Sequence, residues 1–299
     1  MSTDTTSRDT DWRLLSARAG FASHRLIGWI YWDPEAIANY AALGVPDGFG
    51  YYIASRGASL ADAGNDVVVA GFYSIHAGAI AACLDECRKH TTFEDTADAR
   101  DAAVTAGLRR YVPEICDELA DLGPSLWAAA DSLPLSGRPL FASLLRRRRD
   151  DDALLSAWLA VNCIREWRGD THWALHVAED IGPIEAGILD GAWRSYEGDW
   201  VPRSRGADDA ALGAAYAALE ARGLAVDGRV TTAGIDLRQA IEDRLDDISS
   251  TVWRHLGVER TRRFLDLVGP VGNRLIERVD QTAGDKWMPA GRRRPGTDL

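Results

Sequence analysis

One stretch decides the fold of this chain: Gly206-Ala-Asp-Asp-Ala-Ala-Leu-Gly-Ala-Ala-Tyr-Ala-Ala-Leu-Glu-Ala-Arg-Gly-Leu224. Its alanines and spaced leucines predict a helix that ends at a glycine. The segment that follows, Ala225-Val-Asp-Gly-Arg-Val230, predicts a tight β-hairpin, because Asp-Gly between apolar residues favours a two-residue turn. A second helix then begins at Thr231-Thr-Ala-Gly234, where the threonine is a good cap. The order is therefore helix, small hairpin, helix.

The rest of the chain repeats its apolar residues at helical spacing and has no alternating strand–helix pattern or nucleotide-binding glycine loop. We therefore predict a mainly α fold, in which an N-terminal helical domain precedes a C-terminal winged-helix-like domain with a small β-wing. The predicted boundaries are 12–145 for the first domain and 150–285 for the second. A basic tail covers 286–299, and we expect it to be disordered from residue 291.

The predicted helix over 207–221 has the wrong charge for docking on DNA. It carries Asp208, Asp209 and Glu220, and it has no Lys or Arg before Arg222. The whole chain has a net charge of −11 and a pI near 5.0, whereas DNA affinity depends on cations that neutralise phosphates. We therefore expect no nucleic acid among the partners.

The sequence also indicates where the protein works. Its four cysteines are too few and too scattered for a secreted disulfide framework, so we expect reduced thiols in the cytoplasm. The polar, acidic N-terminus has no apolar core of a signal peptide, and no run reaches the roughly 18 apolar residues of a membrane span. We expect a cytoplasmic protein without a membrane partner.

Two further stretches carry a family resemblance. Arg165-Glu-Trp-Arg-Gly-Asp-Thr-His-Trp-Ala174 resembles the R-E-x-R-G-D-x-H-x-A signature of an actinobacterial family of helix-turn-helix, MarR-like proteins. Leu219-Glu-Ala-Arg-Gly-Leu224 and Tyr31-Trp-Asp-Pro-Glu35 match the same family in its winged half and its N-terminal half. The resemblance covers nearly the whole chain. It implies an all-α N-terminal part and a winged-helix-like C-terminal part, and it implies no particular activity.

The chain departs from this family at two places. The usual R-A-A-P-L-G stretch reads Arg56-Gly-Ala-Ser-Leu-Ala61, and the usual F-Y-N-F-x-P reads Phe72-Tyr-Ser-Ile-His-Ala77. Both changes fall where the N-terminal helices are expected to face the Arg-Gly-Asp-x-His segment. They suit a member of the family with a changed ligand, as in specialised metabolism.

The 165–180 segment holds the candidate catalytic residues. We expect Gly169 to end one helix and Asp170 to cap the next. His172 is then the candidate general base, with Asp170 or Glu166 fixing its tautomer. The alternative is structural: Asp170 caps a helix, Arg168 pairs with an acid, and His172 makes a buried hydrogen bond.

A metal site is the weaker alternative for the same segment. His172, His176 and Glu179 follow at i, i+4 and i+7, which places them on one face of a helix. The H-E-x-x-H pattern is absent, however, and we assign no metal. The sequence names no cofactor.

Ligand-binding residues are expected where aromatic side chains are dense, between Trp29 and Tyr73. Adjacent aromatic pairs cannot all point inward from one helix, so some, including Tyr31 and Tyr73, should line a cleft. Arg56 and His76 would supply polar groups there. Arg56 or Arg168 would hold an acidic group of the ligand.

These observations favour a small-molecule-binding protein, extending to an enzyme, with its pocket between the N-terminal helices and the 165–180 segment. One alternative is a MarR-like DNA-binding regulator. Its phosphate contacts would come from the 146–149 arginine run, Arg203-Ser-Arg-Gly206, Arg229 and Arg292–Arg294. Another alternative is a protein-interaction module. The small residues Ala210, Ala214, Ala215, Ala217 and Ala218 permit close helix packing in a homodimer.

Overall fold

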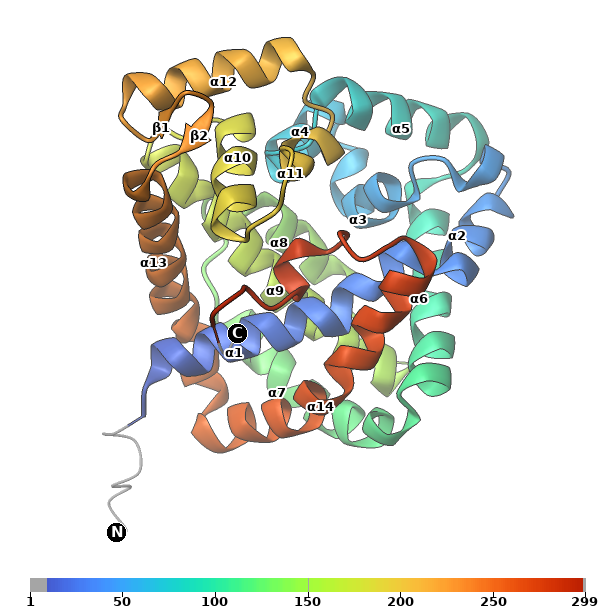
Figure 1. Cartoon of the computed structure of the whole chain (residues 1–299). Coiled ribbons are helices and arrows are strands. Elements are labelled where there is room, and N and C mark those ends of the chain that lie inside the picture. The colour runs from blue at the N-terminus through green and yellow to red at the C-terminus, as the bar shows by residue number, and fades with distance from the viewer. Residues whose placement is uncertain (1–9, 150, 298–299) are drawn as a thin grey trace.

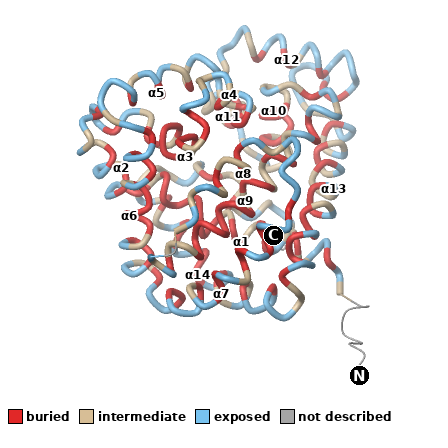
Figure 2. Tube along the Cα trace, turned by 180° about the vertical axis from the view of Figure 1, so that it is seen from behind, coloured by how far each residue is buried: buried red, intermediate tan, exposed pale blue. Residues whose placement is uncertain are grey.

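The computed structural model describes residues 10–149 and 151–297, and nearly all of its regular structure is helical (Figure 1). The longest helix in this part of the chain, α9 (Ala153–Ala178), runs through the middle of the molecule. Helices from both halves of the sequence pack on it: α1 (Trp12–Gly28), α7 (Cys116–Asp131), α8 (Pro139–Leu144) and α13 (Thr232–Leu256). Figure 2 shows that α1 and α9 are largely buried, whereas α5 and α12 lie at the surface.

Six further helices lie around this central group. They are α2 (Pro34–Ala41), α3 (Tyr51–Ala61), α4 (Asn65–Phe72), α5 (Ala77–His90), α6 (Phe93–Tyr111) and α14 (Val258–Thr282). Asp33 caps the start of α2, because its carboxylate accepts hydrogen bonds from Glu35 N at 2.9 Å and Ala36 N at 3.2 Å. Within the described residues, no helix is both long and apolar enough to cross a membrane.

The stretch that decides the fold forms the expected elements. Helices α10 (Pro183–Trp193), α11 (Trp200–Ser204) and α12 (Asp209–Ala221) precede a hairpin of β1 (Ala225–Val226) and β2 (Arg229–Val230). The strands pair antiparallel, with Ala225 opposite Val230. Thr231 Oγ1 accepts a hydrogen bond from Gly234 N at 3.3 Å and so caps α13, as predicted. We refer to α10, α11, α12 and the hairpin together as the 183–230 unit.

The buried apolar residues form one large core and smaller satellite clusters. The large core includes side chains of α1, α3, α6, α7, α9, α13 and α14, so it spans both predicted domains. A smaller core lies inside the 183–230 unit, around Leu189, Leu212 and Leu219. The division into 12–145 and 150–285 stays a prediction, and its boundary does not coincide with a boundary between these cores.

The predicted break at Gly169 is wrong, because α9 continues without interruption from Ala153 to Ala178. Asp170 therefore caps no helix of its own segment. A glycine inside a helix costs only about 1 kcal/mol relative to alanine. Burial of the flanking Trp167 and Leu175 side chains stabilises the helix by more than that.

The tail after α14 is packed, and the prediction of disorder from residue 291 is wrong for residues 291–297. Arg25 Nε donates to Gly291 O at 2.7 Å, and Arg292 Nη2 lies 2.6 Å from Asp280 Oδ1. Arg294 Nη1 donates to Gln239 Oε1 at 2.7 Å. These partners lie far away in sequence, which is why the sequence pattern does not indicate them. Residues 298 and 299 lie outside the described residues.

The contact between the hairpin and α13 yields a prediction. A Cβ atom on Gly234 would lie 2.5 Å from Leu224 O and 2.6 Å from Val230 Cγ1, whereas one on the exposed Gly213 of α12 would meet no atom within 4 Å. We expect Gly234→Ala to lower the free energy of unfolding by about 1–3 kcal/mol, because backbone must move. Gly213→Ala should raise it by about 0.5–1 kcal/mol. Urea unfolding measures both, and equal effects of the two substitutions would contradict this packing.

Candidate functional site

A cavity of about 1200 Å³ lies between the N-terminal helices and the 183–230 unit. Its walls come from α1, α3, the 165–173 part of α9, α10, the α11 region, α13 and the segment after α14. Figure 1 shows how these elements surround the centre of the molecule. Ligand pockets in proteins commonly enclose roughly 300–1,000 Å³, so this cavity has room for a drug-sized molecule.

One side of the cavity is a continuous set of aromatic rings. The ring of Tyr52 on α3 stacks with Trp32 at 5.7 Å between centroids and meets Tyr31 edge-on at 5.2 Å. Trp287 lies 4.5 Å from Trp32 and 5.2 Å from Trp200. We call these five residues the aromatic wall. They come from segments far apart in sequence, and all five line the cavity.

The charge of the cavity lining is opposite to that of the protein. Ten arginines and seven carboxylate residues line it, whereas the whole chain has a net charge of −11. Most of these arginines form ion pairs with carboxylates, so only a few arginine side chains of the lining lack a carboxylate partner among the described residues. Which arginines lack such a partner therefore decides where an anionic group could bind.

Arg56, a predicted ligand residue, lines the cavity but is held by an internal carboxylate. Its Nε and Nη2 atoms donate to Glu166 Oε1 at 2.8 Å and Oε2 at 2.7 Å, and Arg165 pairs with the same carboxylate. Burial raises the pKa of Glu166, but the Arg165 and Arg56 guanidinium groups outweigh burial and hold it well below its ordinary value. Arg56 is thus neutralised without a ligand.

Arg168 is neutralised in the same way, within a chain of ion pairs that links three helices. Arg168 Nη2 on α9 lies 2.7 Å from Glu242 Oε1 on α13, and Glu242 Oε2 lies 2.7 Å from Arg238 Nη1. Arg238 Nη2 in turn lies 2.9 Å from Asp190 Oδ1 on α10, and Arg194 Nε reaches that oxygen at 3.1 Å. We call these five residues the arginine–carboxylate network.

The network fixes the protonation of its carboxylates. Burial raises the pKa of Asp190, but Arg194 and Arg238 outweigh burial and hold it below its ordinary value. Glu242 behaves likewise through Arg238 and Arg168. Both carboxylates are therefore charged at neutral pH, and each has arginine partners.

His172 lines the cavity as predicted, but without its predicted partner. Burial is the main cause that holds the pKa of His172 well below its ordinary value, followed by His176 and Arg238. The ring is therefore neutral at pH 7, and in the described part of the chain its Nε2 atom has no hydrogen-bond partner. The hydroxyl of Tyr31, another predicted ligand residue that lines the cavity, also lacks a partner there.

Asp170 does not orient His172, and this prediction is wrong. Residues two apart on a helix point to opposite sides, and Asp170 Oδ2 accepts a hydrogen bond from Phe141 N at 2.9 Å. It thereby caps the start of α8 from a neighbouring helix. Asp170 is not part of the cavity lining. Burial raises its pKa to about 7.

Two other predicted ligand residues also lie outside the cavity lining. Tyr73 stacks on Trp173 at 4.9 Å and donates a hydrogen bond to Ile181 O, so it ties α4 to the turn before α10. His76 is exposed at the start of α5. Its backbone N donates to Arg205 O at 2.9 Å. Both residues connect the N-terminal helices to the rest of the chain.

The weak metal alternative finds no support in this geometry. His176 Nδ1 is 2.8 Å from His172 O, which bonds it within its own helix turn, and Glu179 lies beyond the end of α9, 3.9 Å from Arg244. Over residues 10–149 and 151–297, no group of three or more His, Cys, Asp or Glu side chains could hold a metal ion.

The sequence analysis did not single out Arg205, a partly buried cation of the cavity that has no carboxylate partner in the described part of the chain. It follows α11 directly and lines the cavity, whereas the sequence assigned the Arg203–Gly206 stretch to DNA contacts. A basic residue next to a short tryptophan-led helix was the available signal. Whether the Arg205 side chain points into the cavity depends on the conformation of the turn after α11, and the sequence does not specify that turn.

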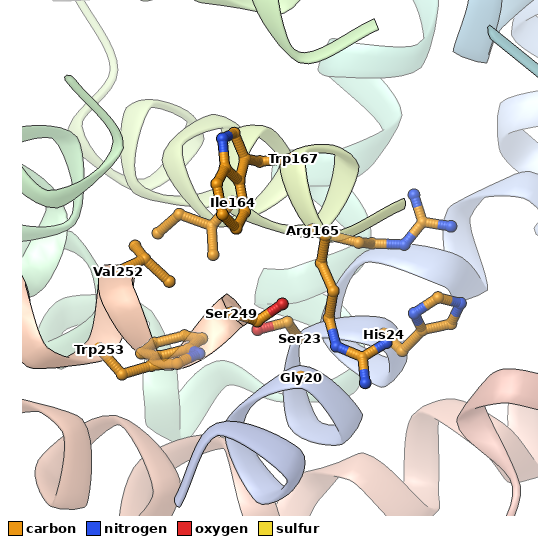
Figure 3. A pocket seen from close by; sticks show the side chains of 10 residues that line it. Gly20, Ser23, His24, Ile164, Arg165, Trp167, Ser249, Val252 and Trp253 are labelled. Atoms are coloured by element: carbon orange, nitrogen blue, oxygen red, sulfur yellow. The ribbon is translucent and has the colours of Figure 1, made fainter. Parts of the chain in front are cut away.

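A second, much smaller cavity lies between α1, α9 and α13 (Figure 3). Its volume is about 10 Å³, which is room for about one water molecule. Ser23 and Ser249 face each other across it, and Ser249 Oγ has no hydrogen-bond partner in the described part of the chain. The small cavity is therefore suited to a structural water and is too small for a ligand.

The exposed surface of α12 and the hairpin is poor in free cations. Arg203 pairs with Asp209 at 2.7 Å, and Arg222 donates to the carbonyls of Asp180 and Glu179. Arg229 has no such partner among the described residues. Of the predicted dimer alanines, Ala215 is buried and the others are exposed or partly exposed, so the homodimer stays a prediction.

Comparison with known proteins gives one result. Residues 16–282 match the model of a Helix-turn-helix family. Because the match covers most of the chain, the protein belongs to this helix-turn-helix family. No curated protein and no solved structure gives a significant match. The MarR-like subtype and the actinobacterial origin stay predictions.

Asp170 yields a prediction about pH. Its raised pKa means that the folded protein keeps a proton that the unfolded chain releases above its ordinary value of 3.8, so stability is lost as pH rises towards about 7. Asp170→Asn keeps an oxygen for Phe141 N and removes the ionisation. At pH 8 we expect this variant to be more stable than the parent by about 2–4 kcal/mol, with no gain at pH 4.

Urea unfolding between pH 4 and 8 measures this difference. Asp246, whose pKa burial raises to about 6, titrates in the same window in both proteins, so only their difference is diagnostic. Parallel stability profiles for the two proteins would show that Asp170 ionises normally.

Proposed function

We propose that this helix-turn-helix protein binds a small molecule in the cavity. The observation that carries the proposal is the cavity itself, a space of about 1200 Å³ that combines the aromatic wall with buried charged groups. Apolar walls with a few fixed polar groups are typical of ligand sites. The location also fits the pocket expected between the N-terminal helices and the 165–180 segment.

The proposal extends to an enzyme through His172. Burial keeps the His172 ring neutral, so its Nε2 atom, unpartnered in the described part of the chain, would serve as the base once an anionic ligand offsets the cost of protonating a buried ring. Asp170 takes no part in this version, because it caps α8. Tyr31, whose buried hydroxyl lacks a partner among the described residues, would contribute a hydrogen bond.

Filling the cavity tests the proposal. Gly169 lines it, and a Cβ atom there would meet only Glu166 Oε2, at 3.3 Å, so Gly169→Phe should occupy the space meant for a ligand. Gly213→Phe is the matched control on the exposed side of α12. Each protein is dialysed against a small-molecule extract of its host cells, and retained compounds are identified by mass spectrometry.

We expect the parent and Gly213→Phe to retain the same compound and Gly169→Phe to lose it by about tenfold or more, since steric exclusion removes the binding volume. Equal retention by Gly169→Phe would contradict the proposal. So would an extract from which the parent retains nothing.

A DNA-binding regulator is the second candidate, and family membership favours it. In this candidate, α10, α11, α12 and the hairpin would act as a winged helix, with α12 in the position of the recognition helix. The same unit forms part of the cavity wall, so a ligand there would serve as an effector. Residues 207–230 carry four carboxylates and two arginines, which opposes phosphate contact.

This second candidate predicts opposite effects for two charge changes. At about 0.1 M salt, Arg229→Ala should weaken binding to duplexes from the upstream region of its own gene by about 3- to 10-fold and reduce the salt slope by about 1. Asp209→Asn should strengthen binding, because it removes a repulsive charge and frees Arg203. Fluorescence anisotropy measures both. This surface would be excluded as a DNA interface if the protein bound no duplex, or if neither substitution changed its affinity for the duplex.

A further inference from the structure

We infer that the cavity takes a planar aromatic ligand with a carboxylate, and that Arg205 binds this carboxylate. The inference rests on the proposed function, because it names the ligand class of the same cavity. Three observations carry it: a cation without a partner, neighbours that are already occupied, and an adjacent aromatic wall.

Arg205 is a partly buried guanidinium in the cavity lining. Over residues 10–149 and 151–297, its side chain has no hydrogen bond and no ion pair. Arg56, Arg168 and Arg238, in contrast, each have carboxylate partners within 3 Å. Burial lowers the pKa of Arg205, which reflects the cost of holding this charge away from water. An anionic ligand would offset that cost.

The groups around Arg205 are already engaged. Asp190, which interacts electrostatically with it, is shared by Arg194 and Arg238. The Tyr52 hydroxyl accepts a hydrogen bond from Arg56 Nη1 at 3.2 Å. The donors of Arg205 are therefore free for a guest, and a guanidinium matches a carboxylate in a two-point arrangement.

The same region offers a surface for a flat ring. Trp200 is the first residue of α11, and Arg205 directly follows the end of that helix. Trp200 contacts Trp287, which contacts Trp32, and Tyr52 stacks on Trp32. A planar aromatic group can stack on such rings while its acid reaches the guanidinium.

The position of Arg205 is fixed from both halves of the chain. Its carbonyl accepts a hydrogen bond from His76 N at 2.9 Å, so the turn between α11 and α12 is tied to the start of α5. A fixed anchor binds with a smaller entropic cost than a mobile one. Asp190, Arg194 and Arg238 also interact electrostatically with Arg205, so the charges around its guanidinium are net positive and favour an anion.

Matched probes test the inference: 2-naphthoate and its uncharged amide, 2-naphthamide. We expect the parent protein to bind the acid more tightly than the amide in isothermal titration calorimetry at pH 7. Arg205→Gln should lower the affinity for the acid by about 10- to 100-fold, because it removes a charged hydrogen-bond pair. The affinity of this variant for the amide should stay within about twofold of that of the parent, which also shows that the variant is folded.

Arg244→Gln is the control, since Arg244 is exposed and lies outside the cavity lining. It should behave as the parent. The inference is overturned if the acid and the amide bind the parent equally, if Arg205→Gln keeps the preference for the acid, or if neither probe binds. The extract experiment judges the proposed function separately, so the two failures can be told apart.

Discussion

The uninterrupted course of α9 is the constraint on which the site depends. Residues four apart on a helix share a side, and residues two apart face opposite sides. Glu166 and Asp170 therefore point towards α3 and α8, where they meet Arg56 and Phe141 N. Arg168 and His172 point the other way, towards α13 and the cavity. The same segment thus holds the Arg56 ion pair and the cap of α8 on one side, and the ion pair with α13 on the other.

The arginine–carboxylate network extends this constraint to the 183–230 unit. Buried ion pairs add little net stability, but removing one partner leaves a costly unpaired charge. The alternation from Arg168 through Glu242 and Arg238 to Asp190 therefore holds α9, α13 and α10 in one arrangement. It also provides carboxylate partners for three arginines of the cavity lining, Arg168, Arg194 and Arg238. Arg205 differs because the network has no carboxylate left for it.

Local sequence chemistry predicted much of the fold. Asp-Gly between apolar residues and Thr231 before a helix each specify a short-range hydrogen-bond pattern, and both form as expected. Gly169 misled the prediction because tertiary burial of its neighbours outweighs a glycine's small helix penalty.

The site was predicted less completely than the fold. Tyr31, Arg56, Arg168 and His172 line the cavity, because the sequence brought aromatic and charged residues to two segments that do meet. Tyr73 and His76, expected to bind the ligand, lie outside the cavity lining, and Asp170, expected to orient His172, accepts a hydrogen bond from Phe141 N instead. A side chain's direction depends on helix phase and on partners far away in sequence. The positions of residues 291–297 and of Arg205 are set entirely by partners far away in sequence.

The charge distribution separates the two candidate functions. The surface of α12 and the hairpin is acidic, whereas the cavity lining has more arginines than carboxylates. Positive charge is thus concentrated inside, where a small anion fits and a duplex does not. Native mass spectrometry of the protein purified from its own host tests this most directly. We expect a noncovalent adduct on the order of a few hundred daltons, one per chain and lost on denaturation. A protein that carries no adduct and binds a duplex tightly through α12 would contradict it.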